Sequence, residues 1–178
     1  MYRGRFANVK GVLTLSKIIK KISKEVKNTF FLFVGGGLLK NKIKKILCGL
    51  RNCRVLDWAP KDRIHHLYIA SDIYVLPSKW EAVPITIIEA MASQLFIITS
   101  KVGGIPYVLS GYPFKIFIDP NNPFELYLRL KKIIHLYQIS QESFRIDTKT
   151  YTSLLSKFDW KTIVERLINL YNCFAYKS

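Results

Sequence analysis

Residues 72–100, "DIYVLPSKWEAVPITIIEAMASQLFIITS", decide the fold of this chain. The apolar runs at 72–77 and 95–100 are rich in β-branched and aromatic residues, which is typical of buried strands. Residues 84–93 lie between them and predict a helix, for which Pro84 suits the first turn. Two strands joined by a crossover helix pair in parallel, so the stretch predicts one strand–helix–strand unit of a parallel sheet.

The same alternation continues in both directions along the chain. The predicted strands are 2–7, 29–35, 53–58, 72–77, 95–100 and 114–119. The predicted helices are 11–27, 38–50, 61–70, 84–93, 123–138, 141–156 and 159–174, and residues 104–110 predict a short turn or helix. The strands are mostly continuous in apolarity, which indicates a sheet covered on both faces. We therefore predict an α/β fold, a doubly wound, Rossmann-like parallel sheet of about six strands, in a single domain over residues 1–178.

The composition excludes several classes of protein. A hydrophobic fraction of 49% excludes a disordered chain. No apolar run approaches the roughly 18 residues that a membrane span needs, and residues 1–11 lack the apolar core of a secretion signal. The three cysteines form no CxxC pair, which favours reduced thiols and a cytoplasmic location.

The net charge of +16 is concentrated in the first third of the chain. Residues 1–60 contain 14 Lys/Arg and 2 Asp/Glu, whereas residues 61–178 contain 14 and 10. A basic half suggests an anionic partner such as phosphate, nucleic acid or a membrane surface, and the alternative is a set of solvated lysines. The predicted helix at 12–27 can rest on anionic lipid at the inner face of a membrane. No nucleic-acid-binding motif accompanies the charge.

Two glutamates flank the predicted helix start, Glu81 in the loop before it and Glu89 within it. The amides of Ile85, Thr86 and Ile87 are predicted to be free there, which makes an anion site. The two carboxylates can accept hydrogen bonds from vicinal hydroxyls, while the free amides hold a diphosphate. A ligand that carries both groups is a nucleotide sugar. The alternative is a capping glutamate and an incidental helix glutamate.

Other candidate residues follow neighbouring strands. Arg5 and Lys10, after the first strand, can clamp a diphosphate, or they form a solvated basic turn. Glycines at 34–37 and 103–104 permit close backbone approach to a ligand, although any tight turn can need them. All these features follow strands of a parallel sheet, so they are predicted to cluster on one edge.

Six motifs, in this order along the chain, resemble the C-terminal, donor-binding half of a family 4 (group 1) glycosyltransferase with the GT-B fold. They are Gly4-Arg5 through Lys10-Gly11, Val34–Gly37, "ASDIYVLPS" (70–78), two glutamates with seven residues between them that close in "EAMA" (81–92), Gly103-Gly104, and "FDWKTIVERLINLY" (158–171). The resemblance covers nearly all 178 residues.

The resemblance implies retaining transfer of a hexose from a nucleotide diphosphate sugar, without a metal or other cofactor. It implies that Arg5 and Lys10 bind the diphosphate and stabilise the departing nucleotide. Glu81 would contact the transferred sugar near its 3- and 4-hydroxyls, and Glu89 would hold the ribose hydroxyls. The remaining residues that it places in the site are Gly36, Trp58 and Ala59 (the last two beside the base), Val83, Pro84, Ile85 and Thr86.

The chain departs from the family's pattern at Gln94, Phe96 and Tyr107, which bear on donor geometry. Because the first predicted strand begins at residue 2, we expect the acceptor-binding domain of such an enzyme to be absent from this chain. The resemblance therefore implies a partner polypeptide that supplies this N-terminal domain. The alternative is a nucleotide-sugar-binding module without catalysis, or a truncated remnant. The sequence does not identify the nucleotide, the sugar or the acceptor.

Overall fold

The computed structural model describes residues 1–140, 144 and 146–175. The contacts divide the chain into two compact units, residues 1–145 and 146–178, where the sequence predicted one domain over 1–178. The first unit carries all six strands. The second carries α7 (Thr148–Ser156) and α8 (Trp160–Ala175). Each of its helices starts behind an aspartate, since Asp147 accepts from the amide of Thr150 and Asp159 from that of Thr162.

The six strands form two parallel, three-stranded sheets. β1 (Tyr2–Arg3), β2 (Phe31–Val34) and β3 (Cys53–Leu56) make the first, with β2 in the middle. β4 (Ile73–Leu76), β5 (Phe96–Ser100) and β6 (Lys115–Ile118) make the second, with β5 in the middle. All five residues of β5 are buried, as expected of a strand covered on both faces.

Backbone hydrogen bonds at Met1 join the two sheets. The amide of Val75 donates to the Met1 carbonyl at 2.9 Å, and the Met1 amine donates to the Ile73 carbonyl at 2.5 Å. The resulting order β3-β2-β1-β4-β5-β6 is that of a doubly wound sheet. The predicted fold class is therefore confirmed. Ligands of such sheets bind outside the carboxyl ends of the strands, near the centre where the order reverses.

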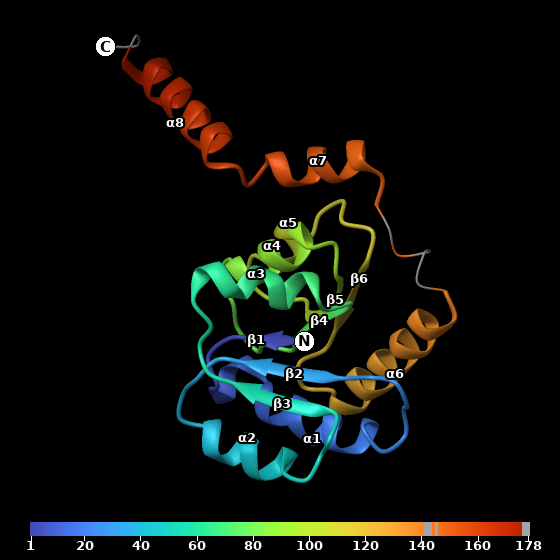
Figure 1. The fold of residues 1–178 in the computed structure, drawn as a ribbon. Coiled ribbons are helices and arrows are strands. Elements are labelled where there is room, and N and C mark those ends of the chain that lie inside the picture. The colour runs from blue at the N-terminus through green and yellow to red at the C-terminus, as the bar shows by residue number, and fades with distance from the viewer. Residues whose placement is uncertain (141–143, 145, 176–178) are drawn as a thin grey trace. The chain divides into compact units, whose positions relative to one another are not determined.

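Helices cover both faces of the sheets (Figure 1). α1 (Val12–Ile22) and α2 (Lys40–Leu47) lie side by side on one face, and α6 (Pro123–Ile139) packs against α1. α3 (Lys61–Ile69), α4 (Ile85–Ala92) and the short α5 (Ile105–Val108) lie on the other. α1 buries Leu15, Ile18, Ile19 and Ile22 and leaves Lys17, Lys20 and Lys21 exposed, which is the pattern predicted for this segment.

Three predicted elements end three or more residues before their predicted ends, and one of them is the helix predicted at 38–50, which ends at Leu47. The strand predicted at 2–7 ends at Arg3, because the Ala7 amide donates to the Arg5 carbonyl and turns the chain into the 3-10 helix η1 (Asn8–Lys10). The helix predicted at 11–27 ends at Ile22, where its last turn tightens. The helix predicted at 141–156 is found as α7, which begins at Thr148. Residues 141–143 and 145 of this prediction lie outside the described residues.

The Met1 amine gives a pH dependence that can be tested. Burial lowers its pKa from an ordinary value of 8.0 to about 5. The unfolded chain therefore binds more protons than the folded chain between pH 5 and pH 8. We expect the free energy of unfolding to rise with pH in this window, by about 1.4 kcal/mol per pH unit from this group alone. Urea unfolding between pH 5 and 8.5, for a chain that begins with a free Met1 amine, measures it.

An N-terminally acetylated chain is the matched control for this titration. Acetylation removes the titrating group and keeps an N–H that can donate to the Ile73 carbonyl. Its stability should change less steeply between pH 5 and pH 8. The same pH slope in both chains would contradict the assignment to Met1.

Candidate active site

The loops that follow four strands meet at the carboxyl edge of the sheets. The Phe6 amide, after β1, donates to the Gly36 carbonyl, after β2, at 2.7 Å. The Gly104 amide, after β5, donates to the Ala82 carbonyl, after β4, also at 2.7 Å. The segments after β1 and β4 are joined as well, since the Lys79 amide donates to the Val9 carbonyl at 2.7 Å. The predicted clustering on one edge is therefore present in the structure.

Glu81 is a buried carboxylate held by two donors. Its side chain is 8% exposed. Lys10, from η1, donates to Oε2 at 2.7 Å, and the Ser78 hydroxyl donates to Oε1 at 2.7 Å. The ion pair with Lys10 and the Ser78 hydrogen bond offset the cost of burying the carboxylate. Glu81 therefore has a fixed position at the end of β4, with a cation beside it.

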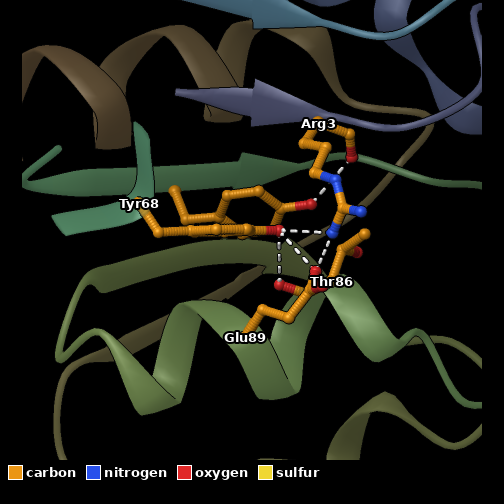
Figure 2. A network of polar contacts seen from close by, with 5 residues as sticks. Arg3, Tyr68, Thr86 and Glu89 are labelled. Atoms are coloured by element: carbon orange, nitrogen blue, oxygen red, sulfur yellow. Dashed lines mark hydrogen bonds and ion pairs between the residues drawn. The ribbon is translucent and has the colours of Figure 1, made fainter. Parts of the chain in front are cut away.

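Glu89 is held by a second group of side chains, shown in Figure 2. Arg3, from β1, pairs with Glu89 Oε2. The Tyr68 hydroxyl, from α3, lies 3.0 Å from the same oxygen and 3.2 Å from the Thr86 carbonyl, so its one proton is shared between them. Both contacts fall on Oε2. Among the described residues none is recorded on Oε1, so this oxygen can accept hydrogen bonds from a ligand.

Burial keeps the Tyr68 hydroxyl in its donor form. Removal from water raises the pKa of this hydroxyl well above its ordinary value, with the nearby Tyr74 adding to the effect. The guanidinium of Arg3 lies over the Tyr68 ring, 5.8 Å from its centroid, and the Tyr74 hydroxyl donates to the Arg3 carbonyl at 2.9 Å. The orientation of the Glu89 carboxylate is thus fixed by groups from β1, α3 and β4.

The start of α4 differs by one residue from the prediction. Pro84 is extended and precedes the first helical residue, Ile85, so it is not in the first turn. The Ile87 amide donates to the Pro84 carbonyl at 3.0 Å. The prediction that Ile87 offers a free amide was therefore wrong. The amides of Ile85 and Thr86 remain at the helix start, where the helix dipole favours an anion.

Comparisons with known proteins agree with this architecture. Residues 1–150 match the family model of glycosyl transferases group 1. The chain belongs to this family. One relative is the GPI3 subunit of phosphatidylinositol N-acetylglucosaminyltransferase from Saccharomyces cerevisiae, to which the group 1 chain is 26% identical. The alignment covers 98% of the group 1 chain and 38% of the GPI3 subunit.

Solved structures of glycosyltransferases share the fold of the group 1 chain. A glycosyltransferase from Rickettsia africae superimposes with a TM-score of 0.80 at 20% identity, over 99% of this chain and 48% of that one. HepE from Anabaena, solved with UDP, gives 0.77 at 18% identity, over 97% and 48%. The group 1 chain therefore spans less than half the length of each of these three proteins.

The structure places the other predicted site residues at the same edge. Arg5 is exposed, and no ion pair with it is found within the described part of the group 1 chain. Gly36 packs against the Trp58 ring, which is 56% exposed. Of the remaining residues, Val83 and Ile85 are exposed, Ala59 and Thr86 are half-buried, and Pro84 is buried.

Sequence reasoning missed Ser78, Arg3 and Tyr68, the partners of the two glutamates. Ser78 ends the motif "ASDIYVLPS" (70–78), but the sequence did not predict that its hydroxyl binds Glu81. Arg3 precedes the Gly4-Arg5 motif by one position, and the alternation of side chains along a strand could have suggested that Arg3 and Arg5 share a face. Nothing in the sequence around Tyr68 distinguishes it from an ordinary core aromatic.

Gly103 holds the backbone of the Glu81 loop in place, which gives a second prediction. Its φ is +53°, and a Cβ there would lie 1.6 Å from the Glu81 carbonyl oxygen. We expect Gly103→Ala to lower the free energy of unfolding by about 3 kcal/mol, since backbone must move to admit the methyl group. Urea unfolding, followed by circular dichroism, measures the change.

Gly49→Ala is the matched control for this substitution. Gly49 also has a positive φ, +82°, but a Cβ there meets nothing within 4 Å. Gly49→Ala should lower the free energy of unfolding by only about 1–2 kcal/mol, which is the strain of an alanine in the left-handed region. Equal losses in the two variants would show that the close contact with the Glu81 loop contributes nothing.

No metal site is evident in the part of the chain that the structure describes, since no group of three His, Cys, Asp or Glu side chains comes together there. Within the same residues, no helix is long and apolar enough to cross a membrane.

Proposed function

We propose that this chain is the donor-binding half of a glycosyltransferase, which transfers a hexose from a nucleotide diphosphate sugar with retention of configuration. The acceptor-binding half is supplied by a second polypeptide. The observation that carries the proposal is the pair of held carboxylates, Glu81 with Lys10 and Glu89 with Arg3, on either side of the start of α4. Membership of glycosyl transferases group 1 supports it.

Each group has a role that suits its position. The amides of Ile85 and Thr86 and the cations of Lys10 and Arg5 bind the donor diphosphate. Glu89 Oε1 accepts from the ribose hydroxyls. Trp58 and Ala59 lie beside the base, and Gly36 and the backbone at Val83 and Pro84 allow the sugar and phosphate to approach closely.

In the transfer step, the bond between the anomeric carbon and the diphosphate oxygen breaks. The bond to the acceptor oxygen forms on the same face, and the acceptor's proton leaves with the nucleoside diphosphate. Glu81 accepts from sugar hydroxyls and orients the anomeric carbon. Lys10 lies between Glu81 and the phosphates and stabilises the charge that develops on the departing nucleotide. The proposal involves no metal or other cofactor.

A binding module without catalysis is the second candidate. Three residues favour it, because they stand where the family's pattern has other residues: Gln94, Phe96 and Tyr107. Such a module would bind the donor and show no turnover with any partner polypeptide.

Calorimetric titration with UDP, GDP and their glucose and N-acetylglucosamine conjugates tests the donor site. Binding of one nucleotide series in the micromolar range is expected, and the series that binds identifies the base. Binding of none by the folded chain alone, and none after the partner polypeptide is added, would exclude the proposed function.

We further propose peripheral contact with anionic lipid on the cytoplasmic side of a membrane, through the adjacent helices α1 and α2. Their exposed lysines are Lys17, Lys20, Lys21, Lys42, Lys44 and Lys45. Flotation with vesicles containing 30% phosphatidylserine should retain the chain at low salt and release it in 0.5 M NaCl, because exposed charges are screened. Retention on pure phosphatidylcholine, or at both salt concentrations, would contradict an electrostatic contact.

A further inference from the structure

Trp80 is an exposed aromatic side chain on a backbone that is held on both sides. It is 65% exposed. On one side the Lys79 amide donates to the Val9 carbonyl at 2.7 Å. On the other side the Ala82 carbonyl accepts from the Gly104 amide, also at 2.7 Å. A large aromatic ring that is held in place gives a ligand much contact area at a low cost in conformational entropy.

Trp80 lies beside both groups that the proposed mechanism places at the breaking bond. Glu81, which would orient the transferred sugar, is the next residue in the chain. Lys10, which would stabilise the departing nucleotide, follows Val9, whose carbonyl holds the Lys79 amide. In the proposed retaining transfer, the acceptor oxygen approaches the face that the diphosphate leaves. A molecule that rests on Trp80 is therefore close to both groups between which the new bond would form.

A contact between two loops brings Lys101 to the same place. A Cβ at Gly103 would lie 1.6 Å from the Glu81 carbonyl oxygen, so the backbones of the two loops touch. Lys101 precedes Gly103 by two residues, and Trp80 precedes Glu81 by one. Because an ammonium group stands on a flexible four-carbon stem, those of Lys101 and Lys79 can both reach a ligand on the Trp80 ring.

These two lysines are cations without an anionic partner among the described residues. Both are exposed, and neither takes part in an ion pair with another residue that the structure describes. Glu81 and Glu89 are the only acidic residues between positions 77 and 111. Each of them already pairs with a cation from the segment 3–10. The charge around Trp80 is therefore complementary to an anionic ligand.

A sugar ring with a carboxylate fits an indole ring that ammonium groups border. The C–H groups on one face of a sugar ring form an apolar surface, and their slightly positive hydrogens are attracted to the negative face of an indole. The hydroxyls and carboxylate around the sugar ring then accept from the ammonium groups. A neutral acyl chain would cover the indole and leave both cations unused.

We infer that Trp80 is the stacking residue of the acceptor subsite and that the acceptor is an anionic saccharide, whose charged groups accept from Lys79 and Lys101. This rests on the proposed function, which supplies the transfer reaction. It deepens that function by naming the chemical class of the acceptor and the residues that select it.

The test uses the three tryptophans of the chain, because each gives one indole N–H signal in a heteronuclear NMR spectrum. Replacing each tryptophan by phenylalanine assigns the signals. The probe is α-1,4-linked trigalacturonate, and its methyl ester is the matched control, which keeps the sugar rings and removes the charges. We expect trigalacturonate to shift the Trp80 signal, to leave the Trp160 signal in place and to bind at least about five-fold more tightly than the ester.

Substitutions separate stacking from charge, with affinities read from backbone amide signals. Trp80→Ala should weaken trigalacturonate binding at least about ten-fold, whereas Trp80→Phe, which keeps an aromatic face, should stay within about three-fold of the unaltered chain. Lys101→Ala should weaken trigalacturonate binding by about three-fold and weaken binding of the ester less. Trp160→Ala removes another exposed indole, 75% exposed on α8, and should change neither affinity.

A Trp80 signal that stays in place, or equal affinity for trigalacturonate and its ester, would overturn the inference. Titration of the same sample with nucleotides separates it from the proposed function, because nucleotides should shift the signal of Trp58, which that function places beside the base. A shifted Trp80 with an unshifted Trp58 would count against the donor site alone. The reverse would count against the acceptor subsite alone.

Discussion

Glu81→Gln is expected to reduce sugar transfer by roughly 100- to 1,000-fold when the chain acts with the proposed partner polypeptide. The amide keeps the shape of the side chain and an oxygen for the Ser78 hydroxyl. It removes the negative charge that pairs with Lys10 at 2.7 Å and that, in the proposed function, accepts from sugar hydroxyls. Transfer of radiolabelled hexose from the nucleotide sugar measures the loss, and calorimetry on the same variant should show less than a ten-fold change in the affinity for UDP or GDP.

Glu25→Gln is the matched control for Glu81→Gln. Glu25 also pairs with a lysine, Lys131, at 2.8 Å, but it follows α1 at the amino end of the sheets. Transfer by this variant should stay within two-fold of the unaltered chain. Unchanged transfer in Glu81→Gln would remove Glu81 from the proposed mechanism. A loss of nucleotide binding as large as the loss of transfer would assign it to binding instead.

Glu89→Ala is expected to weaken nucleotide binding by about 10- to 100-fold, the effect of losing a charge-assisted hydrogen bond to the ribose. Tyr68→Phe should weaken it by a smaller factor, about three- to ten-fold. The Tyr68 hydroxyl contacts Glu89 at 3.0 Å and acts by orienting that carboxylate. Calorimetric titration with the nucleotide that the unaltered chain binds best gives both values.

The double variant distinguishes orientation from a direct contact. If Tyr68 acts only through Glu89, Tyr68→Phe should add nothing in the background of Glu89→Ala, because the carboxylate that it orients is absent. Additive losses would indicate that the hydroxyl contacts the nucleotide itself. Tyr127→Phe, which removes an exposed hydroxyl that donates to Glu25, controls for the general effect of the change and should leave affinity unchanged.

Much of the fold followed from local pattern. The strand predicted at 95–100 was found at Phe96–Ser100, and the helix predicted at 123–138 at Pro123–Ile139. Both are set by apolar periodicity and by turn residues that lie close in sequence. The strand predicted at 2–7 was too long, because the Ala7 amide donates to the Arg5 carbonyl and the chain turns into η1, which the apolar pattern of 2–7 does not show.

The site was predictable in its position and less so in its contacts. The edge on which Glu81 and Lys10 lie follows from parallel topology, since both come after strands. That these two side chains pair, 71 positions apart, required the structure. The pairing of Arg3 with Glu89 was also beyond sequence reasoning, because Arg3 lies on the strand ahead of the recognised motif and its partner lies 86 positions later. The roles assigned to these residues remain predictions.

The close packing of Gly103 on the Glu81 loop limits how the chain can diversify. An insertion or a larger residue at this contact would displace the Glu81 carboxylate together with the backbone that carries it. Laboratory evolution toward a different donor sugar should therefore accept few changes at Gly103 or in the length of the 77–82 loop. Accepted changes should gather at Val83 and Ile85, whose side chains are 55% and 69% exposed at the same edge.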